Sequence, residues 1–301
     1  MTISGNVPSH LVVGARTGFL TTIKAPNLPW RRVATEFQMG AKSVDLVDLG
    51  NAPMPVRSRG RLQVQDYIEK SINIKPLDWD VTISLSYNAL QDDQTGAIKR
   101  LQNNASQIGV NFNKHMNKLV FQAIENGDVA GSVCYDGLTF FNGAHIDKGA
   151  DYQTGQDNVD ALALSLDNFT TELVKAQAFR DDRGEFSEYG YDLLVVPPTL
   201  EYTAAQICGN IQAYDTASRE ANPYSGKFSY VVSPHLAATA WAIVASNEAI
   251  KPVILAMRES PNLQDAWFDP NGADGGLYYF KYYARYTVTY GDWRLAIMGN
   301  S

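Results

Sequence analysis

The sequence has few cysteines, few histidines and no long apolar run, and each shortage excludes a class of protein. Its two cysteines, Cys134 and Cys208, are far apart and in no CxxC pattern, so we expect neither a disulfide framework nor a zinc site. The four histidines form no HxxxH or HExxH pair. The longest apolar stretch, "LAATAWAIVA", is about half as long as a membrane helix. We therefore expect no metal, no cofactor and no membrane contact.

Positive charge is also scarce, which limits the possible partners. The 25 Lys and Arg against 32 Asp and Glu give a formal net charge of -7. A dedicated nucleic-acid binder obtains much of its affinity from clustered Lys and Arg, so any contact with nucleic acid should be weak or local. The chain also lacks a G-x-S-x-G motif and a P-loop, and the glycine-rich 272–276 leads into a strand, which indicates a turn. These absences predict a protein that is not an enzyme.

Two unusually long periodic segments dominate what is present. Apolar residues recur every three or four positions between 98 and 123, which predicts a helix over 92–127, with Asp92 and Asp93 at its start and Asn126-Gly127 at its end. Alternation over 278–290 predicts a strand of about 43 Å, and about 32 helical residues within 92–127 would span about 48 Å. A compact chain of this length has a radius of gyration of only about 19 Å, so we expect a flattened plate.

The N-terminal part predicts extended segments that need a partner surface. Residues 1–48 mix short apolar stretches with Gly, Pro and Thr, and the stretch ending at Trp30 predicts an extended arm with few local contacts. Residues 57–88 predict a two-stranded hairpin, which is only marginally stable alone, with strict alternation over 79–89. On it, Arg57, Arg59 and Arg61 suit carboxylates of a neighbouring subunit, while nucleic acid remains the alternative. We expect truncation of Trp30 or of these arginines to weaken assembly without unfolding the subunit.

Between the two long elements the pattern changes to shorter units. Residues 162–184 predict a helix that ends in a turn. The apolar run 193–196, followed by two prolines, predicts a buried strand leading into a helix, and "YVVSPHLAATAWAIV" repeats this pattern in weaker form. We expect a compact α/β module over 186–271, inserted before the long strand.

The stretch "CYDGLTFFNGAHI", 134–146, resembles an active-site mouth, but a structural interpretation fits it better. A hydrolytic pair of Asp136 and His145 would lack a recognisable nucleophile. As a structural loop, Asp136 would cap backbone amides, Gly137 would adopt a positive φ, and Phe140 and Phe141 would anchor the loop in the core. His145 would form a hydrogen bond within the loop.

Six segments in fixed order resemble the major head subunit of Mu-like tailed bacteriophages, a branch of the tailed-phage capsid fold. The segments are "DDQTG", "YDGLTFFNGAH", "LLVVPPTLEYTAAQI", "VVSPHLAATAWAIV", "KPVILAMRESP" and "RYTVTYGDWRLAIMG", and they cover about 90–298. The resemblance implies an α+β fold with five parts: an N-terminal arm (1–48), an extended-loop hairpin and strand (49–90), a peripheral domain (91–185) with spine helix 92–127, an axial domain (186–271) and a return strand (272–301).

The resemblance also implies a function and partners. Copies of the chain would form hexamers and pentamers of an icosahedral virion shell around double-stranded DNA, assembled in the host cytoplasm with a separate scaffolding protein, a portal and a decoration protein. Trp30, Arg57, Arg59, Arg61 and Lys70 would be intersubunit contacts. Some members cross-link a lysine of the extended loop to the next subunit, a role open to Lys70 or Lys75, although solvated charges are the plainer interpretation. A nanocompartment shell of the same fold and a cytosolic α/β hydrolase are the alternatives.

Overall fold

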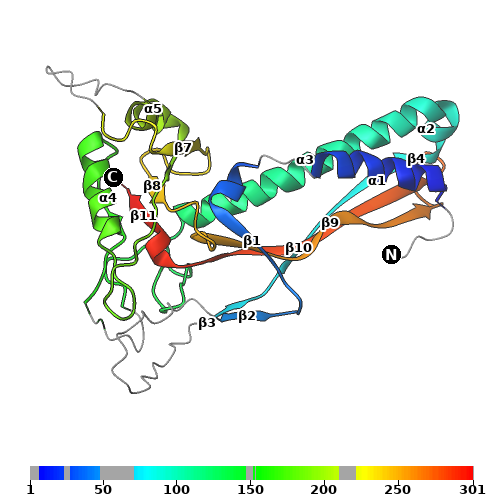
Figure 1. Ribbon diagram of the computed structural model, residues 1–301. Helices are drawn as coiled ribbons and strands as arrows, with labels where there is room; N and C mark the ends of the chain where they lie inside the picture. The colour runs from blue at the N-terminus through cyan, green and yellow to red at the C-terminus, as the bar shows by residue number, and fades with distance from the viewer. Residues whose placement is uncertain are drawn as a thin grey trace, which may run out of the picture.

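Two long antiparallel strands form the axis of the computed structural model, which describes residues 7–23, 28–47, 71–146, 152, 154–209 and 222–300 (Figure 1). They are β9 (Val253–Asp269) and β10 (Leu277–Tyr290), paired from Asp269 with Leu277 at the turn to Val253 with Tyr290 at the far end. The connecting turn contains Gly275 and Gly276, both at positive φ, as the glycine-rich stretch predicts. The predicted long strand is therefore confirmed.

A four-stranded sheet, in the order β1-β9-β10-β4, surrounds this pair. β1 (Ala34–Gln38) runs parallel to β9, and β4 (Leu77–Ser86) runs antiparallel to β10. The predicted alternation over 79–89 is wrong beyond Ser86, because the Ser86 hydroxyl accepts the Ala89 N–H and caps a short helix, α2 (Tyr87–Asp92). The prediction that this strand pairs within a separate hairpin is also wrong, since its partner is β10.

The long helix α3 (Gln94–Glu125) lies along one face of this sheet (Figure 1). The Asp93 carboxylate caps it by accepting the Gly96 N–H at 2.9 Å, while Asp92 ends α2, so only one of the two predicted caps acts on α3. Asn126 closes the helix as predicted. The buried side of α3 follows the predicted spacing of three and four; its large apolar members are Leu101, Ile108, Phe112, Met116, Val120, Phe121 and Ile124.

A second helix, α1 (Ser9–Ile23), which was not predicted from the sequence, packs against α3. Phe19 contacts Phe112 of α3 and Tyr282 of β10. Small residues allow the two helices to approach closely: a Cβ on Gly18 would lie 2.5 Å from the backbone oxygen of Gln102. The apolar side of α1 thus completes the core within its own chain.

Trp30 also lies inside the subunit. It belongs to the 3₁₀ helix η1 (Pro29–Arg32), and its side chain is only 1% exposed. The prediction that Trp30 is an exposed intersubunit contact does not fit this placement. Truncation of a buried tryptophan typically costs about 3–5 kcal/mol, so it would destabilise the subunit itself.

A short two-stranded sheet lies on either side of residues 48–70 in the sequence, and the hairpin predicted over 57–88 did not include this pairing. β2 (Val44–Val47) pairs antiparallel with β3 (Ser71–Ile74). Ile74 packs with Met39 and with Ala256 of β9, which fixes this short sheet to the long sheet. The four predicted contacts on the hairpin lie at 57, 59, 61 and 70, outside the described residues.

The remaining elements form an α/β module at one end of the long sheet (Figure 1). Its sheet has the order β5-β11-β8-β6-β7. The strands are β5 (Val159–Asp160), β6 (Leu193–Val196), β7 (Ser229–Val232), β8 (Trp241–Val244) and β11 (Ala296–Gly299). The helical elements are α4 (Leu166–Gln177), η2 (Pro198–Leu200), α5 (Glu201–Gly209) and η3 (Trp293–Leu295).

The module differs from its predicted composition in two ways. The predicted second strand–proline–helix unit is wrong, because 241–244 forms β8, a central strand whose residues are all buried. A short apolar run does not distinguish a buried strand from a buried helix. The predicted boundaries 186–271 and 272–301 also do not match the two sheets. β9, inside the first range, belongs to the long sheet, and β11, inside the second, belongs to the module. Within the described residues no helix is both long and apolar enough to span a bilayer.

The close approach of α1 and α3 predicts a strong difference between two glycines of α1. Gly18→Ala should lower the free energy of unfolding by about 1–3 kcal/mol, because the new Cβ meets a backbone oxygen that cannot move aside. Gly14→Ala is the matched control, since its Cβ would meet only side chains, Gln102 at 3.5 Å and Ile98 at 3.9 Å, and alanine favours the helix by up to ~1 kcal/mol. Urea unfolding measures both. Equal effects of the two substitutions would contradict the described helix packing.

Candidate functional site

The stretch 134–146 folds as a closed loop between α3 and the module. Gly137 has a φ of 88°, and the Asp136 carboxylate accepts the Leu138 N–H at 3.0 Å, so the predicted turn is present. Phe140 and Phe141 are both buried, with their rings edge to face at a centroid distance of 4.9 Å. The loop is thus anchored as predicted.

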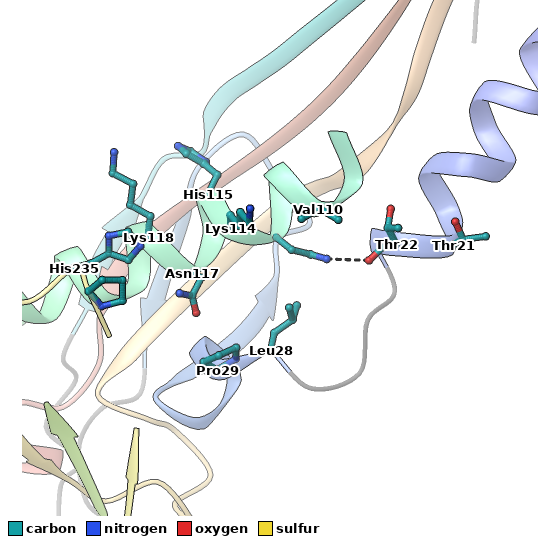
Figure 2. Close-up of a pocket in the computed structure, with 12 residues that line it drawn as sticks. Thr21, Thr22, Leu28, Pro29, Val110, Lys114, His115, Asn117, Lys118 and His235 are labelled. Atoms are coloured by element: carbon teal, nitrogen blue, oxygen red, sulfur yellow. Dashed lines mark hydrogen bonds between the residues drawn. The ribbon is translucent and has the colours of Figure 1, made fainter. Parts of the chain in front are cut away.

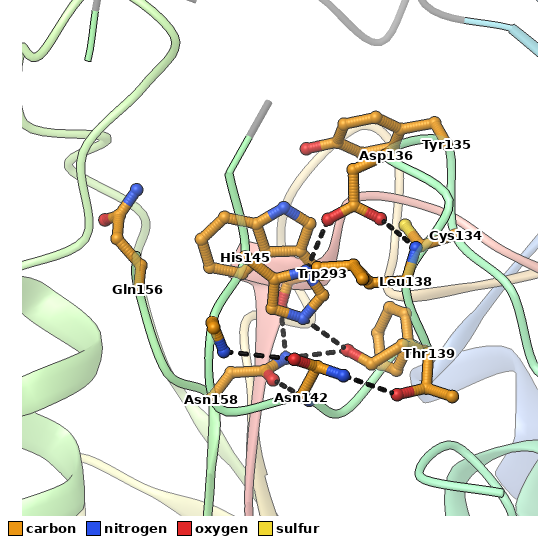
Figure 3. A network of polar contacts seen from close by, with 12 residues as sticks. Cys134, Tyr135, Asp136, Leu138, Thr139, Asn142, His145, Gln156, Asn158 and Trp293 are labelled. Atoms are coloured by element: carbon orange, nitrogen blue, oxygen red, sulfur yellow. Dashed lines mark hydrogen bonds and ion pairs between the residues drawn. The ribbon is translucent and has the colours of Figure 1, made fainter. Parts of the chain in front are cut away.

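His145 and Asp136 form a fully buried pair at the centre of this loop (Figure 3). His145 Nδ1 lies 2.5 Å from Asp136 Oδ2, and Nε2 lies 3.2 Å from the Phe140 carbonyl oxygen. The imidazole ring also stacks on Trp293 at a centroid distance of 4.3 Å. Both ring nitrogens therefore have protein partners and neither side chain reaches solvent, which is the arrangement of a structural pair rather than of an acid–base pair facing a substrate.

Asn158 joins the loop to the C-terminal part of the chain, and sequence reasoning missed it. Its side-chain amide donates to the carbonyl oxygens of Phe140 at 2.9 Å and Trp293 at 3.1 Å, and its oxygen accepts the Asn142 N–H at 2.8 Å (Figure 3). A buried asparagine that satisfies several backbone groups fixes their relative position. No local pattern marks it, because its partners are distant in the sequence.

A buried ion pair lies next to this network. Arg294 Nη1 contacts Asp292 Oδ1 at 3.1 Å and donates to the Tyr135 hydroxyl at 2.7 Å. The Asp292 charge and burial raise the pKa of Tyr189, while burial and the same charge raise the pKa of Tyr191. Both phenols therefore stay protonated and serve as hydrogen-bond donors to this region.

The cysteine of the loop is not a nucleophile. Cys134 is buried, and burial, together with the charges of Asp136 and Asp292, raises the pKa of its thiol well above the usual value. Its sulfur lies 3.3 Å from the Gly291 carbonyl oxygen. The described residues also contain no group of three or more His, Cys, Asp or Glu that could hold a metal ion.

A second buried acid lies on α4. The Glu172 side chain is buried close to Asp160 and to Lys175, whose Nζ lies 2.8 Å from Asp157 Oδ2 and 2.6 Å from Asp160 Oδ2. Burial, followed by the neighbouring Asp160, raises the pKa of Glu172 to about 8. At neutral pH this carboxyl is therefore mostly protonated in the folded protein.

Two cavities open on the surface near η1. One, of about 780 Å³, lies between the end of α1, α3 and the segment before β8; its described lining contains Lys114, His115, Lys118 and His235 but no carboxylate or thiol (Figure 2). The other, of about 660 Å³, is lined by Arg31, Arg32, Lys251 and Asp192 among others. Asp192 accepts hydrogen bonds from Ser246 and Asn247, so it is part of the module's own framework. The Ser246 hydroxyl in the second cavity donates to Asp192 at 2.7 Å, as part of that framework.

Large exposed apolar side chains are spread over separate elements. They include Leu77 and Val81 on the edge strand β4, Val174 on α4, Phe186 in the loop before β6, and Tyr202 on α5. Single exposed apolar side chains are common on protein surfaces and do not by themselves mark a binding site. Sequence reasoning did not select them, because their exposure depends on which face each element buries.

Comparisons with known proteins identify this architecture. The family model described as "Phage capsid protein" matches residues 69–298. The procapsid of bacteriophage JBD30 is 17% identical, with a TM-score of 0.56 over 98% of this chain and 76% of that chain. A virus-like particle from Pyrococcus furiosus is 10% identical, with a TM-score of 0.50 over 95% and 98%. No curated protein matches the sequence significantly. At these identities the likeness concerns the fold, and it confirms the predicted capsid fold.

The buried pair predicts strong coupling between two substitutions. Asp136→Ala and His145→Ala should each lower the free energy of unfolding by about 3–5 kcal/mol, because each leaves its partner buried and unpaired. The double variant should cost clearly less than the sum. The exposed His10→Ala is the control and should stay within about 0.5 kcal/mol. Urea unfolding gives all four values, and additivity within about 0.5 kcal/mol would show that the pair is not coupled.

The buried glutamate predicts a pH dependence. Between about pH 4.5 and 8 the unfolded chain loses the Glu172 proton while the folded chain retains it, so stability should fall as pH rises through this window. Glu172→Gln should remove about 1–3 kcal/mol of this fall. An unscreened charge would contribute ~1.4 kcal/mol for every pH unit of the window, but Lys175 and nearby solvent screen it, so the expected total is smaller. The exposed Glu201→Gln is the control. Unfolding curves at pH 5 and 9 give the change in stability between the two pH values. An equal change for the native protein and for Glu172→Gln would refute the raised pKa of Glu172.

Proposed function

Because the chain belongs to the phage capsid protein family, we propose that it is the major head subunit of a Mu-like tailed phage. Copies assemble into hexamers and pentamers, which close into an icosahedral shell around double-stranded DNA. The Mu-like assignment is supported by the six sequence motifs in their fixed order, and the subunit is a structural component of the virion rather than an enzyme.

The observation that carries this function is the plate built on β9, β10 and α3. A 32-residue helix and strands of 17 and 14 residues are far longer than the usual elements of a compact domain. They give the subunit broad faces and long edges, and among the described strands β1 and β4 lie at the two edges of the sheet. Such edges favour association with other chains. Asp136 and His145, the pair that most resembles a catalytic one, bind each other out of contact with solvent, which supports a structural role.

The contacts between subunits come in part from the predicted extended loop, whose residues 48–70 follow β2 and precede β3 in the sequence. Arg57, Arg59 and Arg61 contact carboxylates of the adjacent subunit, and Lys70 belongs to the same contact. The chain's net charge of -7 supplies acidic partners for these arginines on every copy. Each contact is weak, but one subunit makes several at once, and closure of the shell multiplies them.

Further partners follow from the shell role. A separate scaffolding protein sets the curvature, a portal occupies one vertex, and a decoration protein binds the outside. The subunits assemble in the host cytoplasm, and contact with the packaged DNA is weak and without sequence preference. A nanocompartment of the same fold would enclose an enzyme instead of DNA.

Expression of the chain alone and together with its scaffolding protein tests this function. Light scattering and negative-stain microscopy should reveal hexamers or closed shells, and native particles should have the 260/280 absorbance ratio of packaged DNA. The combined Arg57→Ala, Arg59→Ala and Arg61→Ala variant should assemble less while its circular dichroism stays native.

Two outcomes would count against this account. A strictly monomeric, folded protein under every condition would contradict the shell role. DNA-free particles that enclose an enzyme would show that the shell is a nanocompartment and not a virion. Unchanged assembly of the arginine variant would remove these residues from the contact but would leave the shell role intact.

A further inference from the structure

The two helices that cover the long sheet have a charge opposite to that of the whole chain. α1 and α3 together carry five cations, Arg16, Lys99, Arg100, Lys114 and Lys118, and one carboxylate, Glu125. Their net charge is therefore +4, whereas the chain has a net charge of -7, so the remainder carries -11. This separation divides the subunit into a basic helical layer and an acidic remainder.

Three of these cations lie in one exposed stripe of α3. On α3 the exposed positions Arg100, Asn104, Gln107, Asn111, Lys114 and Lys118 follow steps of four and three, which places them in one stripe along the helix. At 1.5 Å per residue the stripe is about 27 Å long. We call this stripe, together with Lys99 and the exposed Arg16 of α1, the helical face.

Within α1, α3 and the cap residue of α3, the carboxylates lie only at the two ends of α3. Asp93 caps the start of α3, and its second oxygen lies 3.9 Å from Arg100, where both side chains are more than half exposed. Glu125, at the other end, accepts the Ala237 N–H at 2.8 Å and is thus directed toward the module. Between these ends every polar side chain of the stripe is a cation or a neutral amide.

The helical face also lacks the apolar anchors of a protein-binding surface. Among the large apolar side chains that the structure exposes, none lies on α3, and Val13 is the only one on α1. Protein interfaces have an apolar core, while surfaces that bind nucleic acid are polar and cationic. Asparagine, glutamine, lysine and arginine are also the side chains that donate to phosphate oxygens. The composition therefore favours a polyphosphate over an acidic protein.

The cavity at the end of α1 extends this cationic surface. Lys114 and Lys118 lie on the α3 side of it, Thr21 and Thr22 lie on the α1 side, and His235 closes the end nearest the module (Figure 2). Burial and the Lys118 charge lower the pKa of His115, which agrees with a locally positive potential. An anion here would meet at least two lysines from one helix.

We propose that the helical face is the surface of the subunit that contacts packaged double-stranded DNA, through the phosphate backbone and without reading the sequence. This inference depends on the proposed shell function, and it orients the subunit with α1 and α3 facing inward and the opposite side of the sheet facing outward. With at most five cations per subunit and an acidic remainder, single contacts are weak and depend strongly on salt. Many subunits then hold the DNA loosely.

Binding of a labelled 25-base-pair duplex of mixed sequence to the full chain tests the proposal. Fluorescence anisotropy at 25–150 mM NaCl should show binding by the native protein. The double variant Lys114→Gln and Lys118→Gln should bind about tenfold more weakly at the lowest salt, and the slope of log K against log salt should fall by about 2, since each phosphate contact contributes about 0.9. The control carries Lys42→Gln and Lys227→Gln, which remove the same charge from exposed positions elsewhere, and should stay within about twofold of native.

Three results would overturn the proposal. The first is that the native chain binds no duplex at 25 mM NaCl. The second is that the control variant loses as much affinity as the Lys114/Lys118 variant. The third is that polyglutamate of matched charge binds the helical face more tightly than DNA does, which would make this face a site for an acidic protein. Light scattering on the same samples separates this failure from that of the proposed function. If the chain forms normal shells but does not bind DNA, the capsid role remains supported. Only the proposal that the helical face lies inward and contacts DNA is then refuted.

Discussion

The antiparallel pairing of β9 with β10 is the constraint on which the rest of the structure depends. These strands bury a row of large side chains on one face, with Phe280, Tyr282 and Tyr286 fully covered. An apolar row of this length needs an equally long cover, which α3 supplies and α1 completes. The strands also fix the position of the module, because the chain passes from β8 into β9 and from β10 through η3 into β11. Together with the passage from α3 into β5, three crossings of the chain thus join the plate to the module.

The buried polar network stabilises this junction. The Asp136–His145 pair, Asn158 and the Asp292–Arg294 pair lie where β10 ends and the chain turns toward β11. Fully satisfied buried polar groups specify one arrangement, since any displacement leaves a group without its partner. The stretch that resembles an active site therefore serves to lock the long sheet to the module.

Long periodic elements could be predicted from the sequence, whereas partners distant in the sequence could not. α3, β10 and the loop turn at Gly137 follow from local patterns. The sequence did not predict β9 because Pro261 lies within it, and proline argues against a regular strand. In the structure Pro261 lies where the pairing with β10 shifts register, so it removes no hydrogen bond from the regular part of the ladder. The inward position of Trp30, the role of Asn158 and the exposure of the apolar side chains depend on tertiary packing, which no local pattern encodes. The hairpin contacts at 57–61 and 70 remain predictions.

A density map of the assembled particle at a resolution that separates helices from sheets tests the central claim most directly. The account predicts a closed shell one subunit thick, in which α1 and α3 appear as rods on the inner surface and the long sheet lies outside them. A shell with these rods on its outer surface would contradict the assigned orientation. A protein that forms no shell in the presence of its scaffolding partner would contradict the account of the plate as a tiling unit.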